Sequence, residues 1–364
     1  MLTTKEIKKQ IELGNINIKN LSYNALSKPN SCDLRIGNTL YTFDYDIIDT
    51  KNSGKYLDEV LNDKIDSLRR VSIPETGFLL QPHKVYLAKT IEEVSTCGFV
   101  PVLNGKTMLS LLGVSVELTS GYKVDNFNGS FILSIIATKP TIIYPDIKIA
   151  NLTFFPSLKT SQTIKKINDD MSCGVYTSGM LSGEEIKKRM QGENPDIIID
   201  PKDKIVLNPN SVNLTLNDIV GIYSDPVLDM KKDNAVKKIK LGDDGIWFYP
   251  DEIYLGRTNE WTETNNLVPM LSGRSSLGRN GLHVHCSAGM GSIGYKGYWH
   301  MGIRAVKPIK VVKDMKCCQI YYLTADGDND ISYHGYMQNL SKEELGSPLY
   351  KSLIKKYRKD DFKC

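Results

Sequence analysis

Residues 272–282 read Ser272-Gly273-Arg274-Ser275-Ser276-Leu277-Gly278-Arg279-Asn280-Gly281-Leu282. The stretch joins two arginines and several hydroxyl groups with almost no apolar bulk. An arginine presents a rigid fork of N–H donors that matches phosphate oxygens, and glycines let backbone N–H groups approach an anion closely. The pattern therefore indicates an anion-binding loop; its alternative is a polar surface loop with two solvated arginines.

The residues around this loop form a longer series. They are Gly281-Leu282-His283-Val284-His285-Cys286-Ser287-Ala288-Gly289, Gly294-Tyr295-Lys296-Gly297, Pro308, Lys316-Cys317-Cys318-Gln319-Ile320, Tyr333-His334-Gly335-Tyr336-Met337-Gln338 and Gly346-Ser347-Pro348-Leu349-Tyr350. The series resembles the core of the dCTP deaminase and dUTPase superfamily, and the resemblance covers most of residues 180–352. It implies a distorted jelly-roll domain that forms homotrimers, with active sites between neighbouring subunits.

The chain also repeats itself. Tyr86-Leu87-Ala88-Lys89-Thr90 corresponds to Tyr254-Leu255-Gly256-Arg257-Thr258, and the same offset along the chain aligns Gly129 with Gly297 and Pro140 with Pro308. The opening residues 1–10 match residues 180–189 at a slightly larger offset. A nearly constant offset over several motifs predicts two copies of one domain.

Local signals predict the fold of each copy. We expect domains at residues 1–157 and 180–352, a polar linker at 158–179 and a charged tail at 353–364. Each copy opens with a capping box, in which Thr3 or Ser182 caps a helix and Glu6 or Glu185 follows three residues later. Short β-rich runs then alternate with turn residues. The chain is therefore predicted to be all-β with short helices: two tandem copies of a dUTPase-like jelly-roll or β-barrel domain.

The resemblance assigns roles to residues of the C-terminal copy. Those implied to hold the triphosphate or to lie at the reaction centre are Arg274, Ser275, Ser276 and Arg279, with Ser275 and Arg279 catalytic, together with Gln319 and the lid residue Tyr336. Those implied to contact the base and the sugar are Ala288, Gly289 and Tyr295. The implied ligand is a nucleotide such as dCTP, dUTP or dTTP, bound as its Mg²⁺ complex.

The catalytic carboxylates of the superfamily are missing. Hydrolytic deamination needs a base that takes a proton from water. The deaminase glutamate position, five residues after Gly297, holds Gly302, and the dUTPase aspartate position, five residues before it, holds Ser292. In the N-terminal copy Asp125 is one residue out of register with the aspartate position. Restoring the carboxylate with Gly302→Glu is expected to help only if the pocket tolerates the added volume.

The N-terminal copy has also lost the phosphate-binding pattern. It reads Asn104-Gly105-Lys106-Thr107-Met108-Leu109-Ser110-Leu111 where the second copy has the arginine-serine loop, and Asn151 replaces the glutamine. It keeps the early Asp33-Leu34-Arg35 motif. We interpret this copy as a scaffold.

His300 is the candidate substitute base. It lies two residues before Gly302, so both residues face the same side of a strand, and histidine is a competent base near neutral pH. The alternative is that His300 packs beside Trp299 at a subunit interface. His283 and His285 have no cysteine or carboxylate partners of the kind that a zinc site requires, so no zinc is expected.

Composition excludes several classes of protein. The net charge of +4, from 46 basic and 42 acidic residues, is too small to imply a nucleic-acid partner. Seven cysteines without a Cys-x-x-Cys pair or a secretory signal favour reduced thiols in the cytosol. The longest apolar run, at residues 131–137, is too short to cross a bilayer. We expect a cytoplasmic protein, or one of the virion or host cytoplasm if it is viral, with no membrane partner.

Three hypotheses for the function remain open. The first is a dCTP deaminase-type hydrolase with a displaced base, which converts dCTP and water to dUTP and ammonia. The second is a non-catalytic nucleotide sensor or sponge, and the third is a structural trimer, for example in a viral assembly, that reuses the fold. The retained arginine-serine loop favours the first two, and the missing carboxylates favour the last two.

Overall fold

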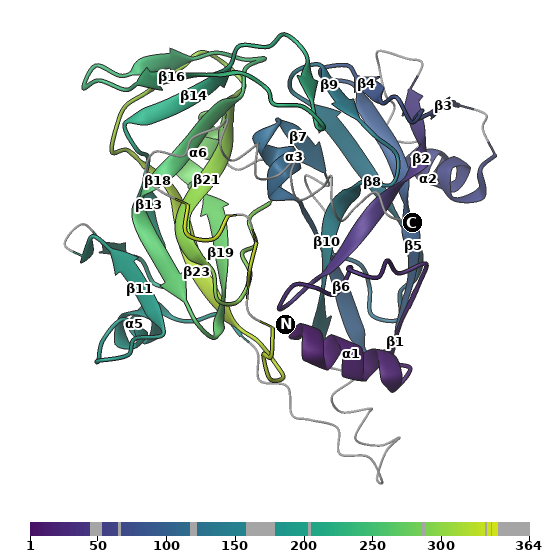
Figure 1. The fold of residues 1–364 in the computed structure, drawn as a ribbon, viewed down its shortest axis with the longest axis horizontal. Helices are drawn as coiled ribbons and strands as arrows, with labels where there is room; N and C mark the ends of the chain where they lie inside the picture. The colour runs from purple at the N-terminus through teal and green to yellow at the C-terminus, as the bar shows by residue number, and fades with distance from the viewer. Residues whose placement is uncertain are drawn as a thin grey trace.

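The computed structural model describes residues 1–43, 53–64, 67–116, 122–157, 179–202, 205–284, 288–331, 333–335 and 337–340. Two β-rich halves stand side by side, residues 1–157 and residues 179–340 (Figure 1). Nearly all of the predicted linker and the whole predicted tail lie outside the described residues. The prediction of a mainly β chain with short helices is confirmed.

The N-terminal half is built around one antiparallel sheet in the order β6-β10-β2-β5-β8-β7, to which β1 and β3 add at β5 and β2. Its elements are α1 (Thr4–Glu12), β1 (Ile16–Lys19), β2 (Cys32–Phe43), α2 (Ser53–Asn62), β3 (Leu68–Ser72), β4 (Phe78–Leu80), β5 (Val85–Thr96), β6 (Phe99–Gly105), α3 (Thr107–Leu111), β7 (Val114–Val116), β8 (Asn128–Ala137), β9 (Thr141–Ile143) and β10 (Lys148–Pro156).

The C-terminal half has two main sheets, β12-β13-β23-β19 and β16-β14-β18-β21-β20, with β11 added at β18. Its elements are α5 (Gly183–Arg189), β11 (Ile197–Asp200), β12 (Val206–Leu207), β13 (Val212–Thr215), β14 (Ile219–Tyr223), β15 (Leu228–Asp229), β16 (Val236–Lys240), β17 (Ile246–Phe248), β18 (Tyr254–Thr264), β19 (Leu267–Gly273), α6 (Ser275–Arg279), β20 (Leu282–Val284), β21 (Lys296–Ala305), β22 (Ile309–Val311) and β23 (Lys316–Thr324).

The two halves repeat the same arrangement. β6, α3, β8 and β10 coincide in length with β19, α6, β21 and β23, at the same offset that aligns Gly129 with Gly297 in the sequence. The pairings repeat as well, because β5 pairs with β2 and β8 as β18 pairs with β14 and β21. One difference is that the continuous strand β2 corresponds to two strands, β13 and β14, in the second half. The expectation of two copies of one domain is thus confirmed in the strand order.

Local chemistry explains where each half begins. The hydroxyl of Thr3 accepts a hydrogen bond from the backbone N–H of Glu6 at 3.3 Å, and that of Ser182 accepts one from Glu185 at 3.2 Å. Each hydroxyl satisfies a backbone donor that the first helical turn leaves without an intrahelical partner. The predicted N-caps are therefore confirmed in both copies.

The halves share one hydrophobic core. A single cluster of buried side chains includes Leu109 and Phe131 from the N-terminal half and Met301 and Tyr322 from the C-terminal half. The short strand β15 pairs in parallel with β9 across the boundary. The ion pair between Lys139 and Glu252, at 3.0 Å, also joins the two halves. The two halves therefore pack against each other through a shared core, a strand pair and an ion pair.

Candidate functional site

The arginine-serine loop lies at the end of a paired strand. β19 pairs with β23 so that Gly273 faces Cys318, and Arg274 follows as the N-cap residue of α6. The Arg274 guanidinium approaches the backbone carbonyl of Lys316 at 3.5 Å. The other predicted phosphate and reaction-centre residues of this loop lie on α6, where none of them is buried: Ser275, Ser276 and Arg279. Arg274 thus lies half-buried against β23, whereas Ser275, Ser276 and Arg279 are exposed to solvent.

Gln319 lies on β23, the strand between β13 and β19 in this sheet. It faces Ser272 on β19 and Asn213 on β13. The hydroxyl of Ser211 donates a hydrogen bond to its side-chain oxygen at 3.4 Å. The register of β19 on β23 therefore places the arginine and the glutamine that the resemblance assigns to the phosphates at neighbouring positions of this strand pair.

The segment of Ala288 and Gly289 lies at the boundary with the N-terminal half. The carbonyl of Gly289 accepts a hydrogen bond from Leu271 N–H at 2.6 Å, and a side chain at Gly289 would collide with the Leu271 carbonyl. The next residue, Met290, contacts Asn30 and Asn104 of the N-terminal half through its sulfur, at 3.9 Å each. The segment implied to read the base therefore faces the first copy, whereas α6 faces solvent.

Tyr295 is buried in the core of the C-terminal half. Its hydroxyl donates to the carbonyl of Tyr298 at 2.7 Å, and its ring packs against those of Trp299 and Tyr333, with centroids 4.9 and 6.1 Å away. The chain after Tyr333 folds back here, since the backbone N–H of Lys296 donates a hydrogen bond to the side-chain oxygen of Gln338 at 2.9 Å. The predicted lid residue Tyr336 lies outside the described residues.

His300 is enclosed on β21, opposite Arg257 of β18. The residue is 3% exposed, and its Nε2 has no hydrogen-bond partner among the described residues. Burial, with a smaller contribution from the charge of Arg257, lowers the pKa of His300 to about 3. A base is most effective when its pKa lies near the working pH, so this imidazole is a weak proton acceptor in this structure. Its catalytic role stays a prediction.

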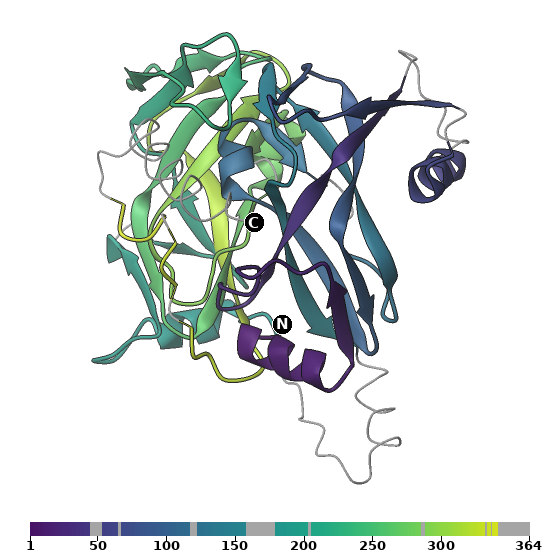
Figure 2. The same cartoon turned by 45° about the vertical axis from the view of Figure 1, so that its right-hand side comes forward.

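The position of the missing glutamate is covered by the other half of the chain. Helix α3 lies at the boundary between the halves and packs against β21 (Figure 2). A Cβ on residue 302 would collide with the carbonyl oxygen of Ser110 and would lie 3.3 Å from the Cα of Leu111. Residue 302 therefore accepts no side chain unless the α3 backbone moves.

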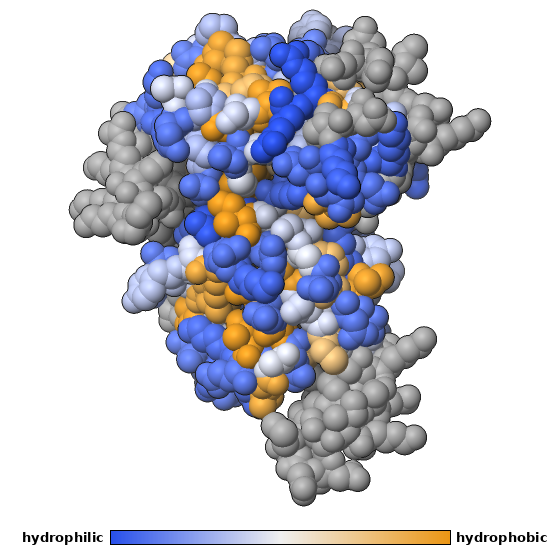
Figure 3. Space-filling view, turned by 90° about the vertical axis from the view of Figure 1, so that its right-hand side faces the viewer, coloured by the Kyte–Doolittle hydropathy of each residue, from blue (hydrophilic) through white to orange (hydrophobic). Residues whose placement is uncertain are grey.

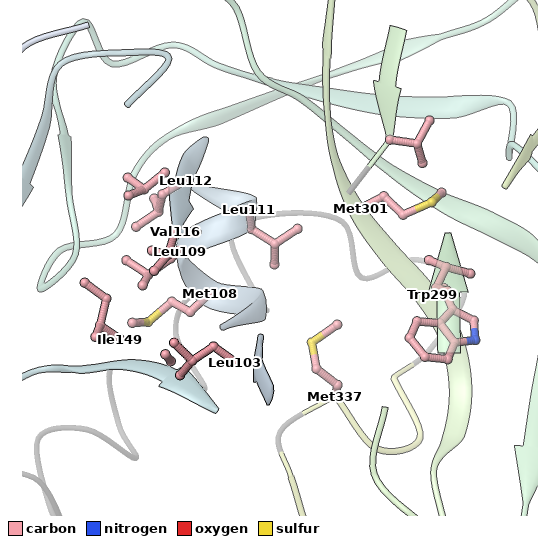
Figure 4. Close-up of a cluster of buried hydrophobic side chains, with 14 of the residues drawn as sticks. Leu103, Met108, Leu109, Leu111, Leu112, Val116, Ile149, Trp299, Met301 and Met337 are labelled. Atoms are coloured by element: carbon pink, nitrogen blue, oxygen red, sulfur yellow. The ribbon is translucent and has the colours of Figure 1, made fainter. Parts of the chain in front are cut away.

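Two further contacts hold α3 in this place. The carbonyl of Leu111 accepts a hydrogen bond from the Tyr223 hydroxyl of β14 at 3.2 Å. The side chain of Leu111 points towards Met301 of β21, while Met108 and Leu112 lie among side chains of the N-terminal half (Figure 4). The helix is thus fixed to both halves.

Helix α3 is the counterpart of α6 in the duplication. The loop of the second copy that carries the phosphate-binding pattern therefore corresponds to the loop of the first copy that covers Gly302. The sequence analysis did not predict the contact of Ser110 with Gly302. The constant offset between the two copies does relate the α3 loop to the α6 loop, but it does not show what either loop contacts.

The described residues offer no protein-built metal site. Within them, no group of three or more His, Cys, Asp or Glu side chains could hold a metal ion. No helix in the described part of the chain is long and apolar enough to cross a membrane.

The family is decided by a direct comparison. A model of the dCTP deaminase-like family matches residues 1–157 and again residues 180–325. The chain belongs to the dCTP deaminase-like family. Two curated relatives are dCTP deaminases described as dUMP-forming, from Clostridium beijerinckii and Leptospira biflexa, 47% and 44% identical over 176 and 178 residues. Each match covers 99% of the relative but only 48% and 49% of this chain.

A solved structure shares the fold over most of the chain. The crystal structure of a 2'-deoxycytidine 5'-triphosphate deaminase from Agrobacterium tumefaciens has a TM-score of 0.67 at 14% sequence identity. The match covers 90% of this chain and 98% of that one. At this identity the likeness shows the fold alone.

Proposed function

We propose that this dCTP deaminase-like protein binds a pyrimidine deoxynucleoside triphosphate at the Arg274 loop and does not deaminate it at Gly302. The observation that carries the proposal is the contact between Ser110 and Gly302, because it fills the space that a catalytic glutamate needs. Loss of the carboxylate and closure of its space together remove the base that takes the proton from water. General acid–base catalysis contributes about 10²–10⁴-fold to a rate, so its loss leaves binding without useful turnover.

The binding part of the proposal rests on the hydrogen-bond donors of the Arg274 loop. Arg274 and Arg279 supply guanidinium groups, Ser275 and Ser276 supply hydroxyl groups, and Gln319 lies on β23, which pairs with the strand that leads into the loop. These groups suit the oxygens of a triphosphate, which accept bidentate hydrogen bonds from arginine. Mg²⁺ would arrive with the triphosphate and be held mainly by phosphate oxygens, as is usual for this ion.

The proposal includes a second copy of the chain as a partner. α6 buries none of its residues, whereas its counterpart α3 is buried against β21 of the other half. If α6 made between chains the contact that α3 makes within the chain, it would lie on β8 of a second chain. Gly278 would then lie near Ser134, because Gly278 corresponds to Ser110 and Ser134 corresponds to Gly302. The outer face of the N-terminal half carries separate apolar patches between polar side chains (Figure 3). A homotrimer is the assembly that the family resemblance implies.

An active deaminase is the second candidate. The relatives that favour it are the dUMP-forming dCTP deaminases at 47% and 44% identity. In that case the base comes from His300, or from Asp125 of the N-terminal half reaching across an interface. The Asp125 carboxylate now accepts a hydrogen bond from the Ser157 hydroxyl at 2.9 Å.

One assay separates these functions. The purified chain is incubated with dCTP or dUTP and Mg²⁺ while ammonia, phosphate and pyrophosphate are followed, and nucleotide binding is measured by calorimetry. We expect binding without ammonia release, and Arg274→Ala should weaken binding by about 1.5–3 kcal/mol, the range for hydrogen bonds to charged groups. Brisk release of ammonia would establish the deaminase. If no nucleotide binds at millimolar concentration, only the hypothesis of a structural trimer remains.

A further inference from the structure

The two halves meet where a short strand of one half adds to a sheet of the other. β15 pairs in parallel with β9, and Asp229 lies opposite Ile142. The backbone N–H of Leu228 donates a hydrogen bond to the carbonyl of Pro140 at 2.8 Å. That of Met230 donates one to the carbonyl of Ile142 at 3.3 Å. β9 therefore has a strand on each side, β4 of its own half and β15 of the other.

The counterpart of β9 in the second half has an open edge. β22 matches β9 at the offset that relates the two copies, and β17 pairs with β22 in the register of β4 on β9. Among the described strands, β22 pairs with β17 alone. Pro308 and Lys310 are the counterparts of Pro140 and Ile142. Their carbonyls therefore face away from β17, at an edge that can accept another extended segment.

The side chains beside β22 are exposed where their counterparts are covered. Val306 is 58% exposed, whereas its counterpart Thr138 is 5% exposed. Val312 is 36% exposed, whereas its counterpart Tyr144 is 7% exposed. The hydroxyl of Tyr144 donates a hydrogen bond to Asp229 beside β9, at 2.9 Å. The surface that the other half covers on the first copy is therefore open on the second.

The sequence of the N-terminal half contains a match to β15. Ile47-Ile48-Asp49 follows β2 as Val227-Leu228-Asp229 follows β14, at one constant offset. The same offset aligns Tyr41 of β2 with Gly221 of β14, and these two residues face equivalent positions of β5 and β18. The matching segment lies outside the described residues, so it is identified by its sequence. Each half thus encodes a segment of the β15 type.

The charges of this segment fit the open edge. Asp229 lies opposite Ile142 on β9, so the equivalent position for Asp49 is opposite Lys310 on β22. Lys310 is exposed and forms no ion pair within the described residues. Residues 44–49 include three aspartates and no basic residue. A carboxylate therefore meets a free ammonium group if the pairing of β15 with β9 is repeated at β22.

We propose that Ile47-Ile48-Asp49 of a second copy adds in parallel to the open edge of β22, with Asp49 beside Lys310. This inference rests on the second-copy contact of α6 proposed above and extends it to a neighbouring strand. The two surfaces are continuous, because a Cβ on Gly281, just after α6, would lie 3.2 Å from the Cβ of Val306. The contact between chains then repeats the contact between halves, with β22 in place of β9.

The test reverses the two charges in the full chain and follows assembly by analytical ultracentrifugation. Lys310→Glu and Asp49→Lys should each raise the concentration at which half of the oligomer dissociates by about tenfold or more, because like charges then face each other across the interface. The double variant restores opposite charges and should assemble as the parent does. Lys237→Glu is the matched control, since it makes the same charge change on an exposed lysine of β16 and should leave assembly unchanged.

Gly278→Trp tests the α6 contact separately. If this variant dissociates the oligomer and the charge reversals do not, the α6 contact stands and the β22 contact is overturned. The β22 contact is also overturned if the double variant stays as dissociated as the single variants, because the two residues then do not face each other. A parent chain that is monomeric at every concentration would overturn both contacts, and nucleotide binding is measured independently of either.

Melting temperatures establish that the variants fold. Lys310 is exposed and without an ion partner in the described part of the chain, so Lys310→Glu should melt at the temperature of the parent. Recovery of assembly in the double variant gives a second check, because a folding defect would persist there.

Discussion

The backbone carbonyl of Ser110 closes the space in front of Gly302, so one half of the chain covers the position at which the other half would carry its catalytic glutamate. The two residues are far apart in sequence and meet because α3 packs on β21. Glycine at this position is therefore a packing requirement as well as the loss of a catalytic group.

Adding a side chain at residue 302 should destabilise the protein. Gly302→Ala places a Cβ against the backbone of Ser110, which does not yield as a flexible side chain would, and overpacking of this kind typically costs about 1–3 kcal/mol. Urea unfolding measures the loss. Gly278→Ala is the control, because a Cβ there meets nothing within 4 Å and alanine favours the helix. Equal stability of the two variants would show that α3 does not lie against residue 302.

Gly302→Glu should not create a deaminase. This substitution was expected to help only if the pocket tolerates the added volume. The pocket does not tolerate it, because even a methyl group at residue 302 collides with the α3 backbone. We expect no ammonia from dCTP and a lower free energy of unfolding than the parent chain. Measurable turnover by this variant would mean that α3 can leave β21.

Acid should destabilise the fold through His300. The pKa of this residue is about 6.5 in the unfolded chain and about 3 in the folded chain, so the unfolded chain binds more protons in between. The free energy of unfolding should therefore fall as the pH drops below 6.5, by up to about 1.4 kcal/mol per pH unit from this residue. His300→Gln should flatten the dependence measured by urea unfolding from pH 7 to pH 5. An unchanged slope would contradict the burial of a neutral imidazole.

Lys28 should cost stability at neutral pH. Its pKa is about 8 in the folded chain against an ordinary 10.5, so the unfolded chain binds more protons between these values. The free energy of unfolding should rise as the pH increases from 8 to 10.5. Lys28→Met should remove that rise and stabilise the chain at pH 7 by about 1–3 kcal/mol, since each pKa unit corresponds to about 1.4 kcal/mol and the hydrogen bond to Asn151 is lost. A destabilised Lys28→Met chain would show that the lysine serves the fold itself.

A bulky residue on α6 should block self-association. Gly278→Trp adds a ring where the chain itself has nothing within 4 Å, so the isolated chain should keep its stability. If α6 docks on β8 of a second copy, light scattering should show the parent chain as an oligomer and Gly278→Trp as a smaller species. Gly242→Trp is the control, since Gly242 is another open glycine and lies between β16 and β17, outside the loop. An oligomer unaffected by Gly278→Trp would place the interface elsewhere.

The sequence by itself determined the features that depend on order along the chain. The constant offset between matching motifs predicted two copies of one domain, because a duplication preserves spacing, and β6, α3, β8 and β10 recur at that offset. The capping hydroxyls of Thr3 and Ser182 were predictable because the bonds that they accept come from three residues later. The chemistry of the Arg274 loop was likewise visible in adjacent residues.

Only the tertiary structure decided which residues meet across the two halves. The contact of Ser110 with Gly302 and the convergence of Lys28, Lys106 and Lys148 on Asp33 join residues distant in sequence. No periodicity or motif spacing encodes such contacts, because they depend on how whole sheets and helices pack. The sequence analysis interpreted the first copy as a scaffold by considering that copy on its own. Because the two halves share one core, the first copy also covers Gly302 of the second.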